Sequence, residues 1–580
     1  MARPKACFTF LLLIFSVFFI SLSFASEGSS GKHRRALIPG ADTVSISGFV
    51  LDNHKEPVPE AQVSIVVNGE ELDHLETAHN GKYVSRFQLK KGEIQTATIE
   101  IKVYKASFQG KTLSFKGNEL ASKEKHYYIS EDVQLARVLG PAFWISTIVF
   151  VLAYILIAFE LLHRTVAAMI GATLMMTISY TIGTVNPAYH IFSYERAIAA
   201  IDMNVIFLLM GMMIIVGVLK HTGVFQWCAY FAYKLAKGKV FLLTVYLMVF
   251  TAVTSAVLDN VTTMLLLTGV AIEICVSLDL NPLDMLIPLV MASNVGGTAT
   301  LIGDPPNIMI GSYAGLTFTN FLLALGLVCA LSLVALVIFC KIYWGKDYAA
   351  AKVESIEDHI QHLKEEYKIT DPGLLTYGLA VLAFAVFLFL THGYWHMEVS
   401  IAALMGAAIL VTIAILTEKI NLIHLIEKDI EWPTLMFFIF LFIIVGAVEE
   451  TGLLALIADW VVHLSHGNFV ISVTLIIWVA AIASAFVDNI PFTATMLPIV
   501  TYLSEVIPGA GDQLWWALAL GACFGGNGTI IGASANVVTM GIAESRGYHI
   551  SFVGFMKKTF PYMVISVAIG QAWLLIFRPH

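Results

Sequence analysis

The chain has 580 residues, of which 58% are hydrophobic and 13% are charged, and its mean hydropathy is +0.78. A soluble protein of this size is rarely so apolar, so the composition indicates a membrane protein with many spans. The formal net charge of −8 is thinly spread, without the basic block of a nucleic-acid-binding protein. The six cysteines include no CxxC pair and none lies between residues 26 and 140, so we expect no metal cluster, and no disulfide framework in that region.

Residues 1–25 are predicted to be a targeting segment. Arg3 and Lys5 form a short basic head, the apolar run "CFTFLLLIFSVFFISLSFA" follows, and "SFA" at 23–25 has the small-x-small pattern of a cleavage site. The alternative is an uncleaved signal anchor, because the apolar run is long for a signal peptide. In either case we expect the segment that follows to be exported.

Residues 26–140 are predicted to form a small, exported, antiparallel β-sandwich of about seven strands. Apolar and polar residues alternate in "DTVSISGFVLDNHKEPVPEAQVSIVVNGEEL" and in "QTATIEIKVYKASF", with turn signals at Pro57 and Asn68-Gly69. The stretch "SGFVLDNHKEPVPEAQVSI" resembles the prealbumin-like modules of many exported proteins. It has no catalytic constellation, so a lid, a spacer or a module that binds an unknown ligand is expected.

From Pro141 onward the sequence predicts an all-α polytopic membrane domain. An α-helix needs about 20 residues to cross a bilayer. Two apolar stretches, 240–277 and 469–506, are each interrupted midway by an Asp-Asn pair. Uninterrupted candidate crossings lie at 141–161, 165–185, 200–219, 284–310, 317–340, 372–391, 397–416, 433–448, 513–541 and 558–577.

The two interrupted stretches belong to an internal duplication. Shifting the sequence by 229 positions places Asp259-Asn260 on Asp488-Asn489 and needs no gap from about residue 202 to 307. A match at one offset over this length indicates a repeat. We predict five crossings and one re-entrant hairpin in each half. The resulting division is transmembrane repeat 1 at 141–345, a cytosolic linker at 346–371 and transmembrane repeat 2 at 372–580.

Lysines and arginines indicate how the repeats are oriented, because they concentrate on the cytoplasmic side. Four lysines, at 220, 234, 237 and 239, follow the crossing at 200–219, whereas the counterpart segment "EETGLLALIADWVVHLSHGN" has neither lysine nor arginine. Five crossings per half, an odd number, would also place the two halves in opposite orientations. Inverted repeats with broken helices are typical of secondary transporters.

Each repeat has a crossing that is expected to unwind near its middle. The stretches "NVGGTATLIGDPPN" and "GGNGTIIGASAN" are rich in glycine, which permits unusual backbone angles, and the first has two prolines, which lack a donor. Such backbone is tolerated at membrane depth only where it is buried in protein or lines a cavity. The Asp-Asn pairs fit hairpin tips that meet these loops, which predicts two pseudo-symmetric sites near the middle of the membrane.

The polar residues at these places have the chemistry of a cation site. An aspartate supplies charge, and asparagine and threonine supply neutral oxygens; such ligands suit Na⁺, and a carboxylate can instead carry H⁺. Na⁺ is therefore expected at Asp259, Asn260, Asp488 and Asn489, and no other cofactor is expected. The predicted ion- or substrate-binding residues are Asp259, Asn260, Thr262, Thr263, Gly296, Gly297, Thr298, Gly303, Asp304, Asn307, Asp488, Asn489, Thr493, Thr495, Gly525, Gly526, Asn527, Gly532 and Asn536.

Simpler explanations stay open for some of these residues. A single aspartate in a crossing can be a structural partner of a neighbouring helix. Asp304, which precedes two prolines, either binds an ion or only caps the second half-helix, and its counterpart is an alanine. Ser293 and Asn294 match an alanine and a cysteine, which are not ion ligands, so a binding role is weaker for them.

The motifs "AVLDNVTTMLLL", "ASNVGGTATLIGDPPNIMIGS", "FVDNIPFTATMLP" and "GACFGGNGTIIGASANVVTMGIAESRGYHISF" closely resemble the P protein (pink-eyed dilution, oculocutaneous albinism type II) family. That family is part of the ion transporter superfamily, with arsenite pumps, NhaD-type antiporters and dicarboxylate/citrate carriers. The resemblance covers about residues 140–580. It implies a dicarboxylate-carrier-like elevator fold, a homodimer and, from P proteins, a role in organelle pH control.

The chain departs from the dicarboxylate carriers at the hairpin tips. Those carriers have Ser-Asn-Thr motifs there, whereas this chain has Asp-Asn-Val and Asp-Asn-Ile. Two extra negative charges would repel a di- or tricarboxylate unless they are protonated or paired with cations, so the departure favours exchange of ions with H⁺ or Na⁺.

The main hypothesis is therefore a secondary active transporter, and not an enzyme, that moves an inorganic ion or a small anion coupled to Na⁺ or H⁺. The alternatives are an anion channel that shunts charge for organelle pH control, a Na⁺-coupled di- or tricarboxylate carrier, and a membrane receptor that binds its ligand through the β module. The expected place is an endolysosome-related organelle or the plasma membrane, with the β domain lumenal or extracellular.

Overall fold

The chain divides after Ala136 into two compact units, which are described separately. The predicted targeting segment at 1–25 and residues 351–366 of the predicted linker lie outside the described residues. The computed structural model describes residues 42–53, 55–90, 93–123, 126–159, 161–350, 367–417, 419–507 and 509–577.

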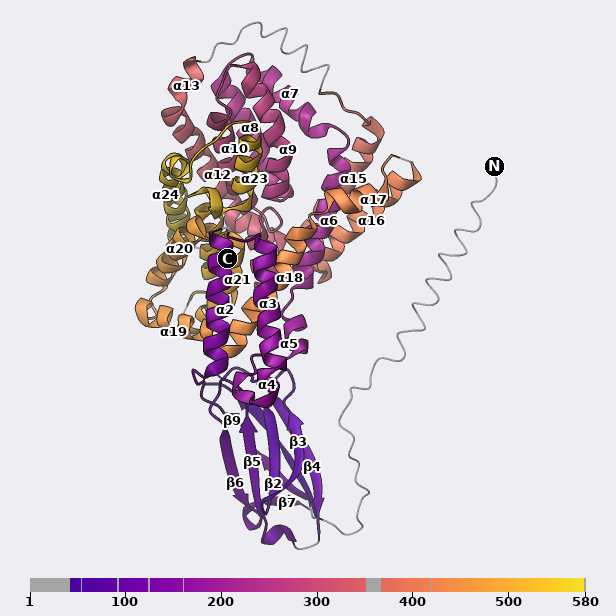
Figure 1. Ribbon diagram of the computed structural model, residues 1–580, viewed down its shortest axis with the longest axis vertical. Coiled ribbons are helices and arrows are strands. Elements are labelled where there is room, and N and C mark those ends of the chain that lie inside the picture. The colour runs from indigo at the N-terminus through magenta and orange to yellow at the C-terminus, as the bar shows by residue number, and fades with distance from the viewer. Residues whose placement is uncertain are drawn as a thin grey trace, which may run out of the picture. The chain divides into compact units, whose positions relative to one another are not determined.

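The first unit contains two β-sheets (Figure 1). One sheet has the order β4-β1-β8-β7 with β9 beside β1, and the other has the order β3-β2-β5-β6. Strand β1 runs parallel to β8 and β9, and the other pairs are antiparallel. The prediction of an antiparallel sandwich is therefore wrong for these two pairs, and the described residues form nine strands rather than about seven. The strands are β1 (Asp42–Leu51), β2 (Gln62–Val67), β3 (Glu70–Glu76), β4 (Lys82–Leu89), β5 (Thr98–Tyr104), β6 (Lys111–Lys116), β7 (Ala121–Lys123), β8 (His126–Ser130) and β9 (Val133–Gln134).

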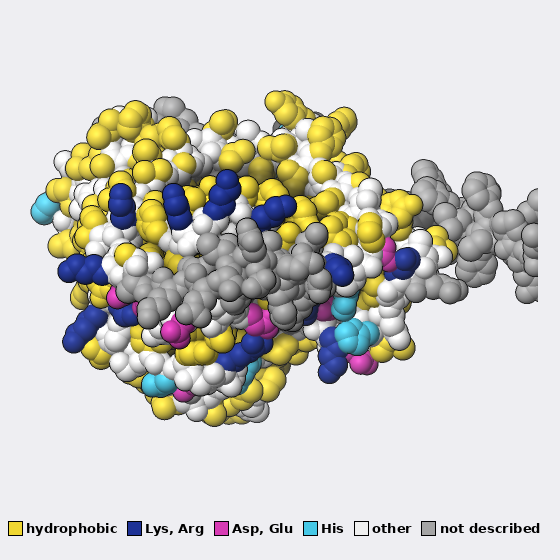
Figure 2. All heavy atoms as spheres, turned by 90° about the horizontal axis from the view of Figure 1, so that it is seen from above, with side chains coloured by type: hydrophobic (Ala, Val, Ile, Leu, Met, Phe, Trp, Pro, Cys, Tyr) yellow, Lys and Arg dark blue, Asp and Glu magenta, His cyan; other side chains and the backbone are white. Residues whose placement is uncertain are grey.

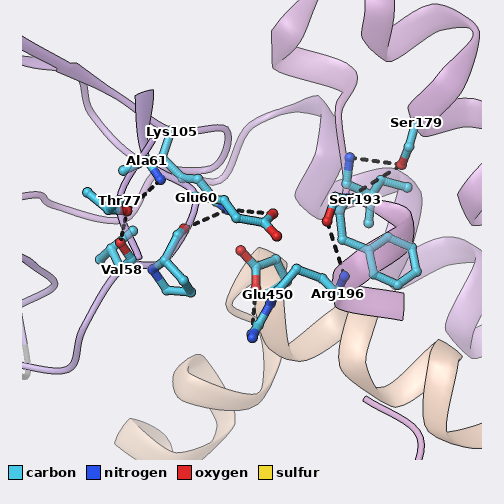
Figure 3. A network of polar contacts seen from close by, with 12 residues as sticks. Val58, Glu60, Ala61, Thr77, Lys105, Ser179, Ser193, Arg196 and Glu450 are labelled. Carbon is cyan, nitrogen blue, oxygen red and sulfur yellow. Dashed lines mark hydrogen bonds and ion pairs between the residues drawn. The ribbon is translucent and has the colours of Figure 1, made fainter. Parts of the chain in front are cut away.

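Alternating apolar residues of both sheets share one hydrophobic cluster, which includes Ile46 of β1, Ile65 of β2 and Ile101 of β5. The predicted turn signal at Asn68-Gly69 joins β2 to β3, and both residues have positive φ, 52° and 88°, as a tight two-residue hairpin turn requires. Thr77 closes the loop before β2, because its hydroxyl accepts from Ala61 N at 2.8 Å and donates to Val58 O at 2.7 Å (Figure 3).

The second unit is helical, and eleven helices of its described residues are long and apolar enough to cross a membrane. The helices of the first half are α2 (Pro141–Ala158), α3 (Arg164–Tyr180), α4 (Ile182–Val185), α5 (Tyr194–Ala199), α6 (Met203–Lys220), α7 (Val224–Ala236), α8 (Val240–Val257), α9 (Asn260–Ser277), α10 (Leu283–Thr298), α11 (Pro305–Ala314), α12 (Phe318–Tyr343) and α13 (Gly345–Ala350). Those of the second half are α15 (Pro372–Trp395), α16 (Val399–Leu416), α17 (Leu422–His424), α18 (Trp432–Thr451), α19 (Leu453–Ser465), α20 (Phe469–Phe486), α21 (Asn489–Val506), α22 (Gln513–Gly525), α23 (Ser534–Ser545) and α24 (Phe552–Phe577).

The ends of the helices follow the 229-residue offset. Helices α7, α8 and α9 begin and end 229 positions before α19, α20 and α21, and α11 begins 229 positions before α23. Figure 1 shows α7 near the upper end of this unit and α19 near its lower end, the placement that opposite orientations of the halves would give. The halves are also interlocked, because α6 of the first packs on α16 of the second, and α18 of the second packs on α3 of the first.

The crossings predicted at 284–310 and 513–541 are each two helices with an irregular segment between them. Helix α10 ends at Thr298 and α11 begins at Pro305, and between α22 and α23 there is a short 3₁₀ turn, η6 (Ile530–Gly532). The interrupted stretches form the helix pairs α8–α9 and α20–α21, with the Asp-Asn pair at each junction. Each arm has 18 residues, about 27 Å of helix. By length and composition α8, α9 and α20 therefore also qualify as crossings, although we predicted re-entrant hairpins.

Two equivalent glycines let the helices of each half approach closely. A Cβ on Gly296 of α10 would lie 2.1 Å from the carbonyl oxygen of Ala252 in α8, and one on Gly525 of α22 would lie 2.5 Å from that of Ala481 in α20. The nearest atoms are backbone, so they cannot move aside as a flexible side chain would. The same helix crossing is thus built at the same offset in both halves.

We predict that Gly296→Ala and Gly525→Ala each destabilise the protein, because the added methyl group would push two packed helices apart. Overpacking of this kind costs about 1–3 kcal/mol. The matched control is Gly541→Ala in helix α23, where an added Cβ meets nothing within 4 Å. Thermal unfolding of the purified protein in detergent should show a midpoint below that of the wild type for the first two variants. The control should show no such decrease. Equal midpoints for all three would contradict the close approach.

Candidate functional site

The two predicted tip aspartates stand at the same point of the backbone in each half. Asp259 is the N-cap of α9, and its Oδ1 accepts from Thr262 N at 2.8 Å. Asp488 is the N-cap of α21, and its Oδ1 accepts from Ile490 N at 3.1 Å. A negative charge is favourable at a helix N-terminus, where backbone N–H groups lack partners. Each aspartate therefore starts the second arm of its hairpin.

The two aspartates differ in their ionic partners. Arg164, the first residue of α3, places Nη1 3.2 Å from Asp488 Oδ2. Ser534 Oγ donates to the same carboxylate oxygen at 2.8 Å and also accepts from Arg164. Among the described residues, Asp259 forms no ion pair with a basic side chain. The halves thus repeat the cap but not the charge balance.

Arg164 was missed in the sequence. It lies just outside the apolar run at 165–185, where a lone arginine can be taken for a flanking residue. Its guanidinium also donates to Thr434 Oγ1 at 3.2 Å and lies 5.2 Å from the ring centroid of Phe437, both in α18. The available signal was an unpaired arginine at the start of a crossing, since such a charge normally has a partner.

Four buried asparagines form a central cluster between the halves. Asn260 Nδ2 donates to Asn294 Oδ1 at 3.3 Å, and Asn294 Nδ2 donates to Asn527 Oδ1 and Asn536 Oδ1, each at 3.1 Å. All four side chains are at most 2% exposed. Asn294, which the sequence comparison gave only a weak role, therefore lies at the centre. Its counterpart Cys523 makes the mirrored contact, because its Sγ lies 3.5 Å from Asn307 Oδ1.

Asp304 reaches from the first half to the hairpin tip of the second. Asn489 Nδ2 lies 3.3 Å from both carboxylate oxygens of Asp304, which is 1% exposed. Its side chain makes no hydrogen bond that caps α11, so the alternative that it only caps this helix is wrong. The predicted tip of one half and the predicted break of the other are thus in direct contact.

Asn307 and Asn536 satisfy the carbonyls that the breaks set free. Asn307 Nδ2 lies 3.2 Å from Gly297 O and 2.8 Å from Thr300 O, and Asn536 Nδ2 lies 2.7 Å from Gly526 O and 2.8 Å from Thr529 O. Gly303 and Gly532 lie where a Cβ would meet Gly297 O and Gly526 O, at 2.5 and 2.8 Å. These predicted residues shape the breaks, and the two asparagine side-chain oxygens face the centre.

Four buried polar atoms of predicted site residues have no hydrogen-bond partner among the described residues: Asn260 Oδ1, Thr263 Oγ1, Thr493 Oγ1 and Asn527 Nδ2. An unsatisfied buried polar atom costs about 1–3 kcal/mol, so such atoms in a native site point to a bound ion, ligand or water. Three of the four are oxygens, which suit a cation, and the fourth is a donor.

Other predicted residues lie outside this cluster or play supporting parts. Thr495 Oγ1 lies 2.6 Å from the hydroxyl of Tyr154 in α2 and 3.0 Å from Pro491 O, so it attaches the second hairpin to α2. Thr298 Oγ1 donates to Asn294 O at 2.7 Å within α10. The hydroxyl of Thr262 is not part of the asparagine cluster, although its backbone N–H is capped by Asp259.

Two cavities stand at equivalent places in the halves and carry opposite charge. One, of about 350 Å³, is lined by Asp202, Glu449 and Glu450 together with Arg196, which pairs with Glu450 at 3.2 Å (Figure 3). The other, of about 430 Å³, is lined by Lys220, His221, Lys368 and Glu273, among others. The 229-residue offset places Lys220 and His221 on Glu449 and Glu450. The duplication has therefore left one acidic and one mainly basic cavity.

The helices, their paired breaks and the buried polar cluster between the two halves define a multi-pass integral membrane protein. The citrate transporter family CitMHS matches residues 154–521, so the chain belongs to this family. It is a membrane transporter and not an enzyme.

Relatives at the level of sequence agree with this assignment. An uncharacterized transporter of Mycobacterium bovis is 41% identical over 433 residues, which are 74% of this chain and 97% of the relative. The P protein of Homo sapiens is 34% identical over 509 residues, which are 74% of this chain and 59% of the relative. The P protein of Mus musculus is 35% identical over 499 residues, with 73% and 59% covered.

Two solved transporters align with the chain at low identity. The Alcanivorax borkumensis YdaH transporter has 12% identity and a TM-score of 0.48, covering 72% of this chain and 99% of that one. The Neisseria gonorrhoeae MtrF, described as an antimetabolite efflux pump, has 10% identity and a TM-score of 0.49, covering 72% and 95%.

We predict that Arg164→Met lowers the free energy of unfolding by about 3 kcal/mol, because it leaves the Asp488 carboxylate without its ionic partner. The two side chains are 25% and 13% exposed, which places the expected loss at the low end for a buried pair. The double variant with Asp488→Asn should lose less stability than the sum of the losses of the two single variants, by at least about 1 kcal/mol.

The matched control for this cycle is the pair of Arg546 and Glu273, whose atoms lie 3.4 Å apart but whose side chains are 46% and 45% exposed. An exposed pair contributes at most about 1 kcal/mol, so Arg546→Met should change stability little. Unfolding in detergent followed by tryptophan fluorescence measures both cycles. Additive losses at Arg164 and Asp488 would show that their contact has no energetic coupling.

Proposed function

We propose that this chain is a secondary active transporter that moves a small anion or an inorganic ion, with Na⁺ or H⁺ as the coupling ion. The observation that carries the proposal is a pair of buried oxygens at the start of α9, Asn260 Oδ1 and Thr263 Oγ1, which have no hydrogen-bond partner among the described residues. They lie on the helix that Asp259 caps, and the carboxylate of Asp259 has no ionic partner in this part of the chain. A carboxylate with neutral oxygens next to it is a suitable environment for a hard cation or a proton.

The coupling ion is assigned to the first-half tip rather than equally to both tips. Arg164 already compensates the charge of Asp488, so a cation at that carboxylate would compete with a guanidinium. Asp304 is the other carboxylate of the cluster without a basic partner among the described residues, and it supplies a second place for a proton or a cation close to Asn489.

The charges also bear on the cargo. Arg164 offsets one of the two extra negative charges that argue against a di- or tricarboxylate, so only the charge of Asp259 remains uncompensated at the tips. The amide nitrogen of Asn527, which lacks a partner, is a donor that an anionic cargo can use. A small anion, with citrate and other carboxylates included, therefore fits the cluster when cations or protons neutralise both Asp259 at the first-half tip and Asp304 at the break.

Transport would proceed by alternating access between two inverted halves in an elevator-like carrier that forms a homodimer. Figure 1 shows the equivalent helices α7 and α19 at opposite ends of the helical unit, which supports an inverted orientation of the two halves. Figure 2 shows lysine and arginine side chains spread over the upper face, the end near α7, and this face is assigned to the cytosol. The β unit precedes α2 in the chain and is assigned to the lumenal or extracellular side, where it would bind an unknown ligand, in an endolysosome-related organelle or at the plasma membrane.

An anion channel for organelle pH control is the second candidate, and the basic cavity favours it. Lys220 and Lys368 outnumber Glu273 on the wall of a cavity of about 430 Å³, and a cleft with an excess of one sign of charge raises the local concentration of the opposite ion.

In proteoliposomes, with Na⁺, H⁺, Cl⁻, citrate and arsenite varied one at a time, the wild-type chain should show flux that depends on a Na⁺ or pH gradient. Asp259→Asn should lower that dependence at least about tenfold, because it removes the charge that holds the coupling ion. Asp279→Asn is the control, since Asp279 is exposed and its φ of 52° suits asparagine. Unchanged coupling in Asp259→Asn would remove this residue from the coupling site.

Reversal potentials separate the carrier from the channel. For a coupled carrier the reversal potential should move with the gradients of both the cargo and the coupling ion. For a channel it would follow the permeant anion alone and stay fixed when Na⁺ and pH are changed. Planar-bilayer or whole-organelle recording with each gradient varied in turn makes the measurement, and a potential that ignores Na⁺ and pH would overturn the carrier.

A further inference from the structure

Two histidines and one aspartate converge at the end of α6, away from the central cluster. His221 Nε2 lies 2.9 Å from Asp429 Oδ2, and the rings of His221 and His424 have centroids 5.8 Å apart. One ligand atom from each of the three residues lies within 4.8 Å of the other two. His424 and Asp429 are five positions apart, whereas His221 lies about 200 positions before them, so no local sequence motif contains all three residues.

The backbone holds the aspartate in a fixed place beneath the histidines. Asp429 ends a π-helical turn, η5 (Leu425–Asp429), which packs on α6. Gly217 of α6 permits this approach, because a Cβ there would lie 2.7 Å from Asp429 Cβ. The Asp429 side chain is only 3% exposed, whereas that of His221 is 36% exposed. A buried carboxylate thus faces two imidazoles that solvent can reach.

This set of donors is chemically selective. Two imidazoles and one carboxylate are the ligands of many zinc sites, with a water in the fourth position, whereas Mg²⁺ and Ca²⁺ prefer oxygen ligands alone. Zinc–ligand bonds of about 2.0–2.1 Å require the three ligand atoms to lie closer together than 4.8 Å. His424 lies on α17, a helix of only three residues, so a small shift of this short helix would bring its imidazole nearer.

Lys220 completes the surroundings of the carboxylate. Its Nζ lies 3.4 Å from Asp429 Oδ1, which leaves Oδ2, the oxygen that faces His221, for a metal. A hydrogen bond to the second oxygen of a ligating carboxylate is a common outer contact and fixes the orientation of the ligand. The lysine side chain is 42% exposed, so its ammonium can also move toward water when a cation binds.

We propose that His221, His424 and Asp429 bind a divalent transition-metal ion such as Zn²⁺. The ion would join the end of α6, in the first half, to the connection between α16 and α18, in the second half. His221 and Lys220 also line the basic cavity, so a bound ion adds positive charge at its wall. This site is independent of the proposed coupling site and requires neither a particular cargo nor transport itself.

The test uses the full-length chain in detergent, without an affinity tag and stripped with a chelator. Calorimetric titration with Zn²⁺ alone should show saturable binding of about one ion per chain, and Co²⁺ should give the visible absorption of a four-coordinate site. His221→Ala, His424→Ala and Asp429→Asn should each weaken binding at least about tenfold. A large excess of Mg²⁺ or Ca²⁺ should not compete.

The matched control is His549→Ala, which removes a histidine that also touches a carboxylate, Glu544 at 3.1 Å, but has no third ligand nearby among the described residues. It should bind Zn²⁺ as the wild type does. If His221→Ala or Asp429→Asn does not fold, His424→Ala decides, and Zn²⁺ should raise the unfolding temperature of the wild type but not of this variant. The proposal would be overturned if the wild type showed no saturable Zn²⁺ binding, or if His424→Ala bound Zn²⁺ as tightly as the wild type does.

Discussion

The membrane unit depends on pairing every polar backbone group that its broken helices set free. Inside an apolar helical unit no solvent is available to do this, so the partners must be side chains. Asn307 and Asn536 fill this role in the two halves, because the side-chain nitrogen of each donates to a carbonyl at the end of the helix before the break and to another within the break. Each amide then has its oxygen left over, and this oxygen accepts a contact from Asn294 or Cys523 at the centre. The same two asparagine side chains therefore stabilise the breaks and form part of the central polar cluster.

The duplicated halves keep the backbone and change the charge. Both hairpin tips begin a helix with a capping aspartate, and both close crossings rely on a glycine. Only Asp488 has an arginine beside it, and the equivalent cavities carry acidic residues in one half and lysines in the other. Caps and close crossings are set by backbone geometry, which constrains the residue type strongly, whereas a cavity wall tolerates either sign of charge. Substitutions at the walls can thus make the two faces of a symmetric scaffold electrically unequal.

Local sequence signals predicted much of this architecture, and long-range packing did not follow from them. The N-cap aspartates and the glycine- and proline-rich stretches mark where helices start and break, which is why the junctions at Asp259 and Asp488 lie where the repeat placed them. The pairing of Arg164 with Asp488 joins helices 324 positions apart, and α3 and α18 interlock across the halves. A residue-by-residue repeat comparison also undervalued Asn294, because it assumed that both halves must carry the same ligand.

An ion can shift a conformational equilibrium only through interactions that differ between the two states. Groups that are already paired, such as the Asn307 amide nitrogen or the Asp488 carboxylate, have little to gain from a ligand. The unpaired atoms of Asn260 and Thr263 have the most to gain, since pairing each would remove about 1–3 kcal/mol. Two such atoms would supply a few kcal/mol, which is enough to change the ratio of two states by about a hundredfold. The neutral oxygens at the start of α9 are therefore as important to coupling in this chain as the aspartate beside them.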